Sequence, residues 1–182
     1  GGSAVAVASG VAGAALGSDT GGSVRIPAAW TGTVGLKPSY GRLSRHGLIP
    51  LVNSLDCPGL ITRSVRDLAT VLEAVQGRDL MDSTSVTSDS LEMNCLDNES
   101  VKDLKIGIPQ EFHCDGMSPE ILSAWSRVAS LLDDAGAKVE TVSLPHTSLA
   151  SPTYSGLSPC EVASNMSRYD GLEYGLRGEG AG

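Results

Sequence analysis

The sequence has few aromatic residues, few basic residues and no long apolar run. Aromatic side chains make up 4%, with a single Phe, and 13 Lys and Arg stand against 21 Asp and Glu, for a net charge of −8. A protein that binds nucleic acid on its own needs a basic surface, so this charge argues against that class. Because no run of 18 apolar residues occurs, we predict no membrane span.

The four cysteines show no metal-binding or redox spacing. Cys57, Cys95, Cys114 and Cys160 are scattered, and no pair has the C-x-x-C spacing. We interpret them as reduced thiols of an intracellular protein and predict no metal site. The sequence starts without Met, inside a glycine-rich turn, and shows no signal segment. We therefore expect an internal section of a longer protein.

Apolar runs and turn residues predict the elements of the N-terminal half. Small residues over 3–8 indicate a helix, and residues 14–16 and 34–36 indicate buried strands. Residues 38–62 contain several turn residues, so we predict a long structured loop there. A capping box and regular apolar spacing predict a helix over 64–75.

The C-terminal half has the pattern of a β-α-β unit. Residues 82–103, rich in Ser, Thr, Asp and Asn, are the predicted exposed linker. Strands are predicted over 104–108 and 139–144, with a helix between them that Ser118 caps. This order predicts a parallel strand pair and an α/β fold. A last helix is expected at about 150–170.

A glycine-rich loop carries the strongest chemical signal. Residues 17–23 have the sequence Gly-Ser-Asp-Thr-Gly-Gly-Ser, directly before a predicted short helix. Glycines let successive backbone N–H groups point at one place, which suits a phosphate or a transient oxyanion. A phosphate loop would end in G-K-S or G-K-T, and this loop does not. An oxyanion site needs a nucleophile, and Ser23 is in place.

The residues alone identify no base for Ser23. Arg25 stands where a G-x-S-x-G elbow would have its last glycine, and Lys37 follows a predicted strand end. The histidines are interpreted as surface or structural residues; they are His46, His113 and His146. Two interpretations stay open at this point: a nucleophile site, or a glycine-rich turn that only packs a strand against a helix.

Two stretches resemble the signature of the amidase signature family. Residues 17–29 and 35–41 carry this long and specific pattern, and the opening Gly-Gly-Ser-Ala resembles the end of the family's S-S-G-G-S-A stretch. Within the family, the chain is most similar to the glutaminase subunits of tRNA-dependent amidotransferases, of the mitochondrial type. The stretches that indicate this are residues 44–56, 81–85 and 161–175.

The resemblance implies a fold and a catalytic triad. The fold would be α/β, with a mixed β-sheet between α-helices, of which residues 1–182 form an internal section of a single domain. The triad would be Ser–Ser–Lys, with Ser23 as nucleophile. The bridging Ser and the Lys would fall before Gly1, so we expect the chain by itself to be inactive. Backbone N–H groups would form the oxyanion hole, those of Thr20, Gly21, Gly22 and Ser23.

The resemblance also implies a reaction and partners. Ammonia released from glutamine would pass to B and C type subunits, which convert Glu-tRNA(Gln) to Gln-tRNA(Gln) in the mitochondrial matrix. The partner would use ATP and Mg²⁺, and this chain would bind no cofactor. Two alternatives remain: a general amidase that acts on another amide, and a non-catalytic scaffold subunit.

Three further residues are expected near this site. Asp19 and Arg25 flank the loop, and we interpret them as a pair that shapes the turn. Tyr154 matches the position where related subunits place a Tyr near bound glutamine.

Overall fold

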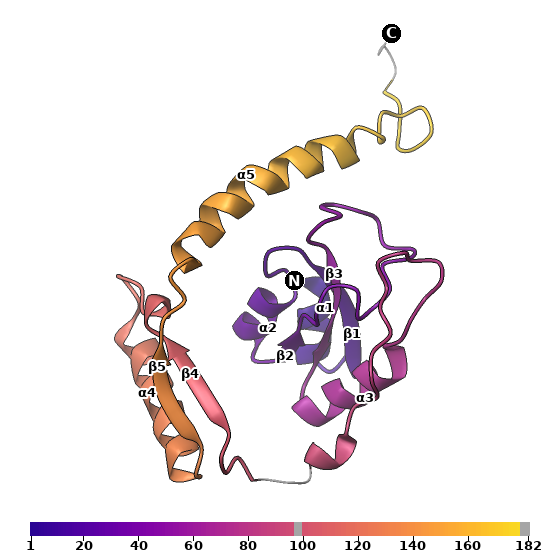
Figure 1. The fold of residues 1–182 in the computed structure, drawn as a ribbon. Helices are drawn as coiled ribbons and strands as arrows, with labels where there is room; N and C mark the ends of the chain where they lie inside the picture. Colours follow the sequence, from indigo (N-terminus) through magenta and orange to yellow (C-terminus); the bar gives the residue numbers. More distant parts are fainter. Residues whose placement is uncertain (97–99, 179–182) are drawn as a thin grey trace. The chain divides into compact units, whose positions relative to one another are not determined.

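The structure is a computed structural model that describes residues 1–96 and 100–178. It divides into two compact units, which are described separately below (Figure 1). Unit 1 comprises Gly1–Met93 together with the described residues from Leu157 onward, and unit 2 comprises Asn94–Gly156. Among the described residues, no helix has the length and apolar character needed to cross a membrane.

Unit 1 contains an antiparallel sheet of three strands. They are β1 (Ala14–Asp19), β2 (Val34–Leu36) and β3 (Cys57–Thr62), and β3 lies between the other two. Asp19 at the end of β1 lies opposite Cys57 at the start of β3. The strands over 14–16 and 34–36 are confirmed, and β1 continues further than predicted, through the first residues of the glycine-rich loop.

The central strand β3 was missed, because residues 38–62 were predicted to be a loop. Pro58 and Gly59 resemble a turn, yet β3 is buried along nearly its whole length. β2 pairs only with the stretch Leu60–Thr62, so Pro58 has a strand neighbour on one side alone. A proline can occupy such a half-open position because its missing N–H costs little there.

Helices cover both faces of this sheet. Neighbouring residues of a strand point to opposite faces. Ile61 packs with residues of α1 (Gly2–Ala8) and with Val24, the residue directly before α2 (Arg25–Thr31). Leu60 packs with α3 (Val65–Val75). The expectation of a sheet between helices is thus confirmed for unit 1. The residues of the two clusters are Ala4, Val7, Val24 and Ile61 on one face, and Leu43, Leu60, Leu68 and Leu72 on the other.

The predicted cap and stripe of α3 are present. The Ser64 hydroxyl accepts a hydrogen bond from the Asp67 N–H at 3.1 Å, as a capping box requires. Leu68 and Leu72 are both 7% exposed, which places the apolar stripe against the sheet. Beyond α3, Asp82 and Ser85 are also buried, so the first residues of the predicted linker 82–103 pack within unit 1.

Unit 2 is the predicted β-α-β unit. Strands β4 (Lys105–Pro109) and β5 (Lys138–Val142) pair in parallel, and α4 (Pro119–Asp134) connects them. The Ser118 hydroxyl accepts a hydrogen bond from the backbone N–H at the third residue of α4, as predicted. The last helix, α5 (Thr147–Met166), begins in unit 2 and ends in unit 1. Two short 3₁₀ helices complete the elements, η1 (Met93–Leu96) and η2 (Gln110–Phe112).

Candidate active site

The glycine-rich loop winds around the buried carboxylate of Asp19. β1 delivers this residue to the start of the loop, and its side chain has no exposed surface. Three backbone N–H groups donate to it, from Gly22 at 2.7 Å, Val24 at 3.1 Å and Arg25 at 3.3 Å. The polypeptide therefore turns from strand to helix around a buried negative charge, whose hydrogen bonds fix the path of the loop.

Arg25, the first residue of α2, supplies the counter-charge. Its Nη2 lies 2.9 Å from Asp19 Oδ1 and its Nε lies 3.0 Å from Oδ2, so the pair is bidentate. Burial opposes ionisation of Asp19, but the guanidinium and the backbone donors outweigh it and lower the pKa of Asp19 to about 2. Asp19 is thus a carboxylate at neutral pH. The pair shapes the turn, as interpreted from the sequence.

Gly22 is needed for its conformation, and its N–H has a different partner from the one expected. Its φ is +123°, and a Cβ atom would lie 2.6 Å from the side chain of Ile26. Because its N–H donates to Asp19, the structure does not leave it free for an oxyanion. Among the described residues, the other three expected donors have no acceptor for their N–H groups; they are Thr20, Gly21 and Ser23.

Ser23 lies in the turn that leads into α2, with its side chain exposed. No described residue forms a hydrogen bond with its hydroxyl, so unit 1 brings no base to it in this structure. Lys37, the residue considered as a base, donates to the carbonyl of Pro38 at 2.7 Å. The nucleophile predicted from the sequence is therefore accessible, beside N–H groups that have no other partner.

Asp56 is a residue of this site that sequence reasoning missed. It is 2% exposed and directly precedes β3. Its Oδ1 accepts a hydrogen bond from the Thr20 hydroxyl at 2.6 Å, and its Oδ2 accepts from the N–H groups of Leu51 and Val52 at 2.8 and 2.9 Å. One signal was available: Asp56 is the only charged residue between His46 and Arg63, in a stretch that is otherwise apolar or neutral.

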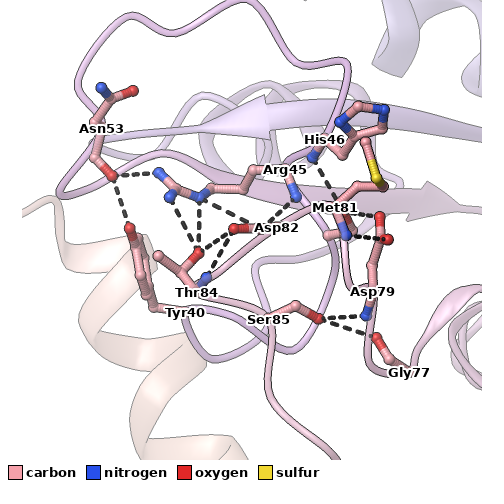
Figure 2. Close-up of polar contacts among 11 residues, drawn as sticks. Tyr40, Arg45, His46, Asn53, Gly77, Asp79, Met81, Asp82, Thr84 and Ser85 are labelled. Carbon is pink, nitrogen blue, oxygen red and sulfur yellow. Dashed lines mark hydrogen bonds and ion pairs between the residues drawn. The ribbon is translucent and has the colours of Figure 1, made fainter.

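The segment that leads to Asp56 is held by a polar network (Figure 2). Arg45 lies over the ring of Tyr40, 4.8 Å from its centre, and donates to the hydroxyl of Thr84 and the carbonyl of Asn53. Asp82 accepts from the Arg45 N–H at 2.8 Å. These contacts join the chain on either side of α3, so residues 40–53 are fixed against residues 82–84.

Tyr154 lies in the part of α5 that belongs to unit 2, and its side chain is 41% exposed. The loop with Ser23 belongs to unit 1. A role for Tyr154 at bound glutamine stays a prediction. Within the described residues, no three His, Cys, Asp or Glu side chains cluster as metal ligands would.

The sequence profile of the family called Amidase matches residues 1–180, nearly the whole chain. The chain belongs to the Amidase family. The solved structures below share its fold. The expected α/β class is confirmed by this likeness.

Several relatives carry the same name. The A subunit of mitochondrial glutamyl-tRNA(Gln) amidotransferase is 57% identical in Anopheles gambiae over 180 residues, and 56% identical in Xenopus laevis over 179. Each alignment covers 98% of this Amidase chain, but only 37% and 34% of the relative. The chain thus spans about a third of the length of the curated relatives that it matches.

Solved structures of two kinds resemble the chain. The A subunit of glutamyl-tRNA(Gln) amidotransferase from Thermotoga maritima has a TM-score of 0.82 and 38% identity, covering 96% of this chain and 37% of that one. Native peptide amidase from Stenotrophomonas maltophilia has a TM-score of 0.75 and 35% identity, covering 92% and 35%. The likeness therefore extends to a protein named as a peptide amidase as well as to an amidotransferase subunit.

Proposed function

We propose that this chain is the nucleophile-bearing section of the glutaminase subunit of a tRNA-dependent amidotransferase. One observation carries the proposal: the exposed Ser23 stands beside backbone N–H groups that have no acceptor among the described residues. The loop that bears it is fixed by the ion pair of the buried Asp19 carboxylate with Arg25. The names of the relatives at 55–57% identity support the choice of reaction. In the full-length protein, the bridging Ser and the Lys of the triad would come from outside this sequence.

The proposed reaction proceeds through an acyl-enzyme. The Ser23 oxygen attacks the side-chain amide carbon of glutamine, while its proton passes through the bridging Ser to the neutral Lys. The C–N bond then breaks, ammonia leaves with a returned proton, and water hydrolyses the glutamyl ester. The N–H groups of Thr20, Gly21 and Ser23 would stabilise the tetrahedral oxyanion, each worth about 3 kcal/mol.

The partners follow from the same proposal. Ammonia would pass to a B type subunit, held with a C type subunit, which amidates Glu-tRNA(Gln) using ATP and Mg²⁺. The net charge of −8 supports tRNA binding mainly by the partner, because phosphates need a basic surface. The relatives are named mitochondrial, which supports a location in the mitochondrial matrix.

A general amidase is the second candidate, because the peptide amidase of Stenotrophomonas maltophilia shares the fold at 35% identity. The higher identity to the amidotransferase subunits favours the first. Hydrolysis of glutamine by the assembled complex, increased by Glu-tRNA(Gln) and ATP, would separate the two. An amidase of other specificity would hydrolyse peptide or aryl amides without either addition.

Substitution of Ser23 tests the proposal directly. In the full-length protein assembled with its partners, Ser23→Ala should lower kcat for ammonia release from glutamine by more than about 1,000-fold, because the nucleophile is lost. Ser9→Ala is the matched control, since Ser9 is an exposed serine of the same unit whose hydroxyl donates only to its own helix. Unchanged activity in Ser23→Ala would support the non-catalytic scaffold instead.

A further inference from the structure

We propose that Asp56 is a positioning residue for the nucleophile loop and that it acts through the hydroxyl of Thr20. The inference rests on the proposed function, since it concerns the same loop. Asp56 contacts neither Ser23 nor any group expected to react, so its role is to hold geometry. The observation behind it is a buried carboxylate that receives a 2.6 Å hydrogen bond from the first residue of the loop after β1.

Two carboxylates hold the loop at its two ends. Asp19 closes β1, and Asp56 precedes Cys57, which lies opposite Asp19 in the sheet. Asp19 binds the backbone of the second half of the loop, from Gly22 onward. Asp56 binds the first half through a side chain, at Thr20. The sheet therefore brings two buried acceptors to neighbouring strand ends, and the loop spans them.

This arrangement separates the N–H groups of the loop into two sets. Those of Gly22, Val24 and Arg25 point to Asp19. Thr20 is held through its hydroxyl, and its own N–H has no acceptor among the described residues. A side-chain tether fixes the residue without consuming its backbone donor. Positioning by Asp56 thus keeps the Thr20 N–H available for a developing oxyanion.

Asp56 is itself rigidly placed. The N–H groups of Leu51 and Val52 donate to its second oxygen, and its own N–H donates to the Val52 carbonyl at 2.8 Å. The carbonyl of Leu51 also accepts from the side-chain amide of Asn165 on α5 at 3.0 Å. This closed turn leaves the carboxylate little freedom to follow a displaced loop. The Arg45 network holds the segment that leads into the turn (Figure 2).

The test is a double-mutant cycle in the full-length protein assembled with its partners. Asp56→Asn and Thr20→Val should each lower kcat for glutamine hydrolysis by about 10- to 100-fold. KM should stay nearly unchanged, because the loop N–H groups are needed to stabilise the transition state and not to bind glutamine. The double variant should be no slower than the slower single variant, since Asp56→Asn removes the charge of the acceptor and Thr20→Val removes the donor of the same contact. Thr20→Ser keeps the hydroxyl and should retain nearly the full kcat.

Two further measurements keep the outcomes distinct. Asp67→Asn removes the charge of the carboxylate that accepts from the Ser64 hydroxyl at the cap of α3, away from the loop. It should lower the melting temperature while kcat stays unchanged. The rate at which a fluorophosphonate labels Ser23 reports the nucleophile without glutamine. If the protein without substitutions is labelled but does not hydrolyse glutamine, the proposed function fails. Slower labelling of Thr20→Val than of that protein would still support the positioning role of Asp56.

The proposal is overturned by either of two results. Additive losses in the double variant would show that Asp56 and Thr20 act separately. Wild-type kcat and labelling rate in Thr20→Val would show that the tether has no catalytic consequence. Thr20→Val and Thr20→Ser both change a single, partly exposed residue, so both variants are expected to fold. The comparison between them therefore stands even if Asp56→Asn does not fold.

Discussion

Helices α3 in unit 1 and α4 in unit 2 have equally regular apolar stripes, and they are buried to different extents. Leu68 and Leu72 on α3 are 7% exposed, whereas Trp125 and Val128 on α4 are 36% and 51% exposed. Between α4 and its two strands the described residues line an apolar hollow of about 330 Å³. An apolar stripe thus predicts a helix and its inward face, but not how completely that face is covered.

The two units also differ in how they hold acidic side chains. In unit 1, Asp19 is fully buried and paired with Arg25. In unit 2, Glu111 accepts hydrogen bonds from the Leu144 N–H and the Ser143 hydroxyl, which lower the pKa of Glu111 to about 2. Both carboxylates have a lowered pKa, yet only the first is sealed from water. Burial therefore distinguishes a charge that shapes the fold from one at the surface.

Removing the buried charge should have the largest effect. Asp19→Asn in the 182-residue chain leaves the Arg25 guanidinium and three backbone donors without their carboxylate, and we expect a loss of about 3 kcal/mol of unfolding free energy in unit 1. Hydrogen-exchange mass spectrometry on peptides of each unit measures this. Glu111→Gln is the matched change in unit 2 and should have a much smaller effect. Equal losses would contradict the contrast between the units.

Core truncation should come next. Leu72→Ala removes a buried side chain from the cluster around Leu60, and we expect a loss of about 2 to 3 kcal/mol. Val128→Ala removes a half-exposed side chain from α4 and should cost below about 1 kcal/mol. Urea titration of the 182-residue chain, followed by hydrogen exchange in peptides of α3 and α4, compares the losses of unfolding free energy in the two variants. A larger loss for Val128→Ala would show that the α4 face is covered.

Acid should lower the unfolding free energy of unit 1 by somewhat less than Asp19→Asn or Leu72→Ala does. The pKa of Asp19 is about 2 in the folded protein, below its usual value of 3.8, so its contribution is complete above about pH 4 and is lost as the pH falls towards 2. The expected loss is about 2 kcal/mol over that interval. The Asp19→Asn variant is the control, because its unit 1 stability should vary less between about pH 5 and pH 2. An identical dependence in both proteins would contradict the role given to this carboxylate.

Much of the fold could be predicted from the sequence, because many of its features depend on residues that are close together in the chain. Caps such as Ser64 and Ser118 depend on residues three positions apart, and parallel pairing of β4 with β5 follows from the length of the helix between them. β3 could not be predicted in this way. Its Pro58 is compatible with a strand because β2 stops short of it.

The site shows the same division. The Asp19–Arg25 pair lies within one short loop, so the motif was sufficient to predict it, and the role of Ser23 in the same loop stays a prediction. The partner of the Gly22 N–H depended on how the backbone folds around Asp19, whereas the family resemblance had implied that this N–H belongs to the oxyanion hole. Asp56 reaches Thr20 across 36 residues of chain, and only the pairing of β1 with β3 brings them together.

The most direct test of the central claim, that Ser23 is the nucleophile of this loop, is to map a covalent adduct. The full-length protein would be treated with a glutamine-like electrophile and digested, and the modified peptide identified by mass spectrometry. We predict an adduct on Ser23 that is absent in Ser23→Ala and retained in Ser9→Ala. An adduct on another residue, unchanged in Ser23→Ala, would contradict the claim and leave the loop only a packing role.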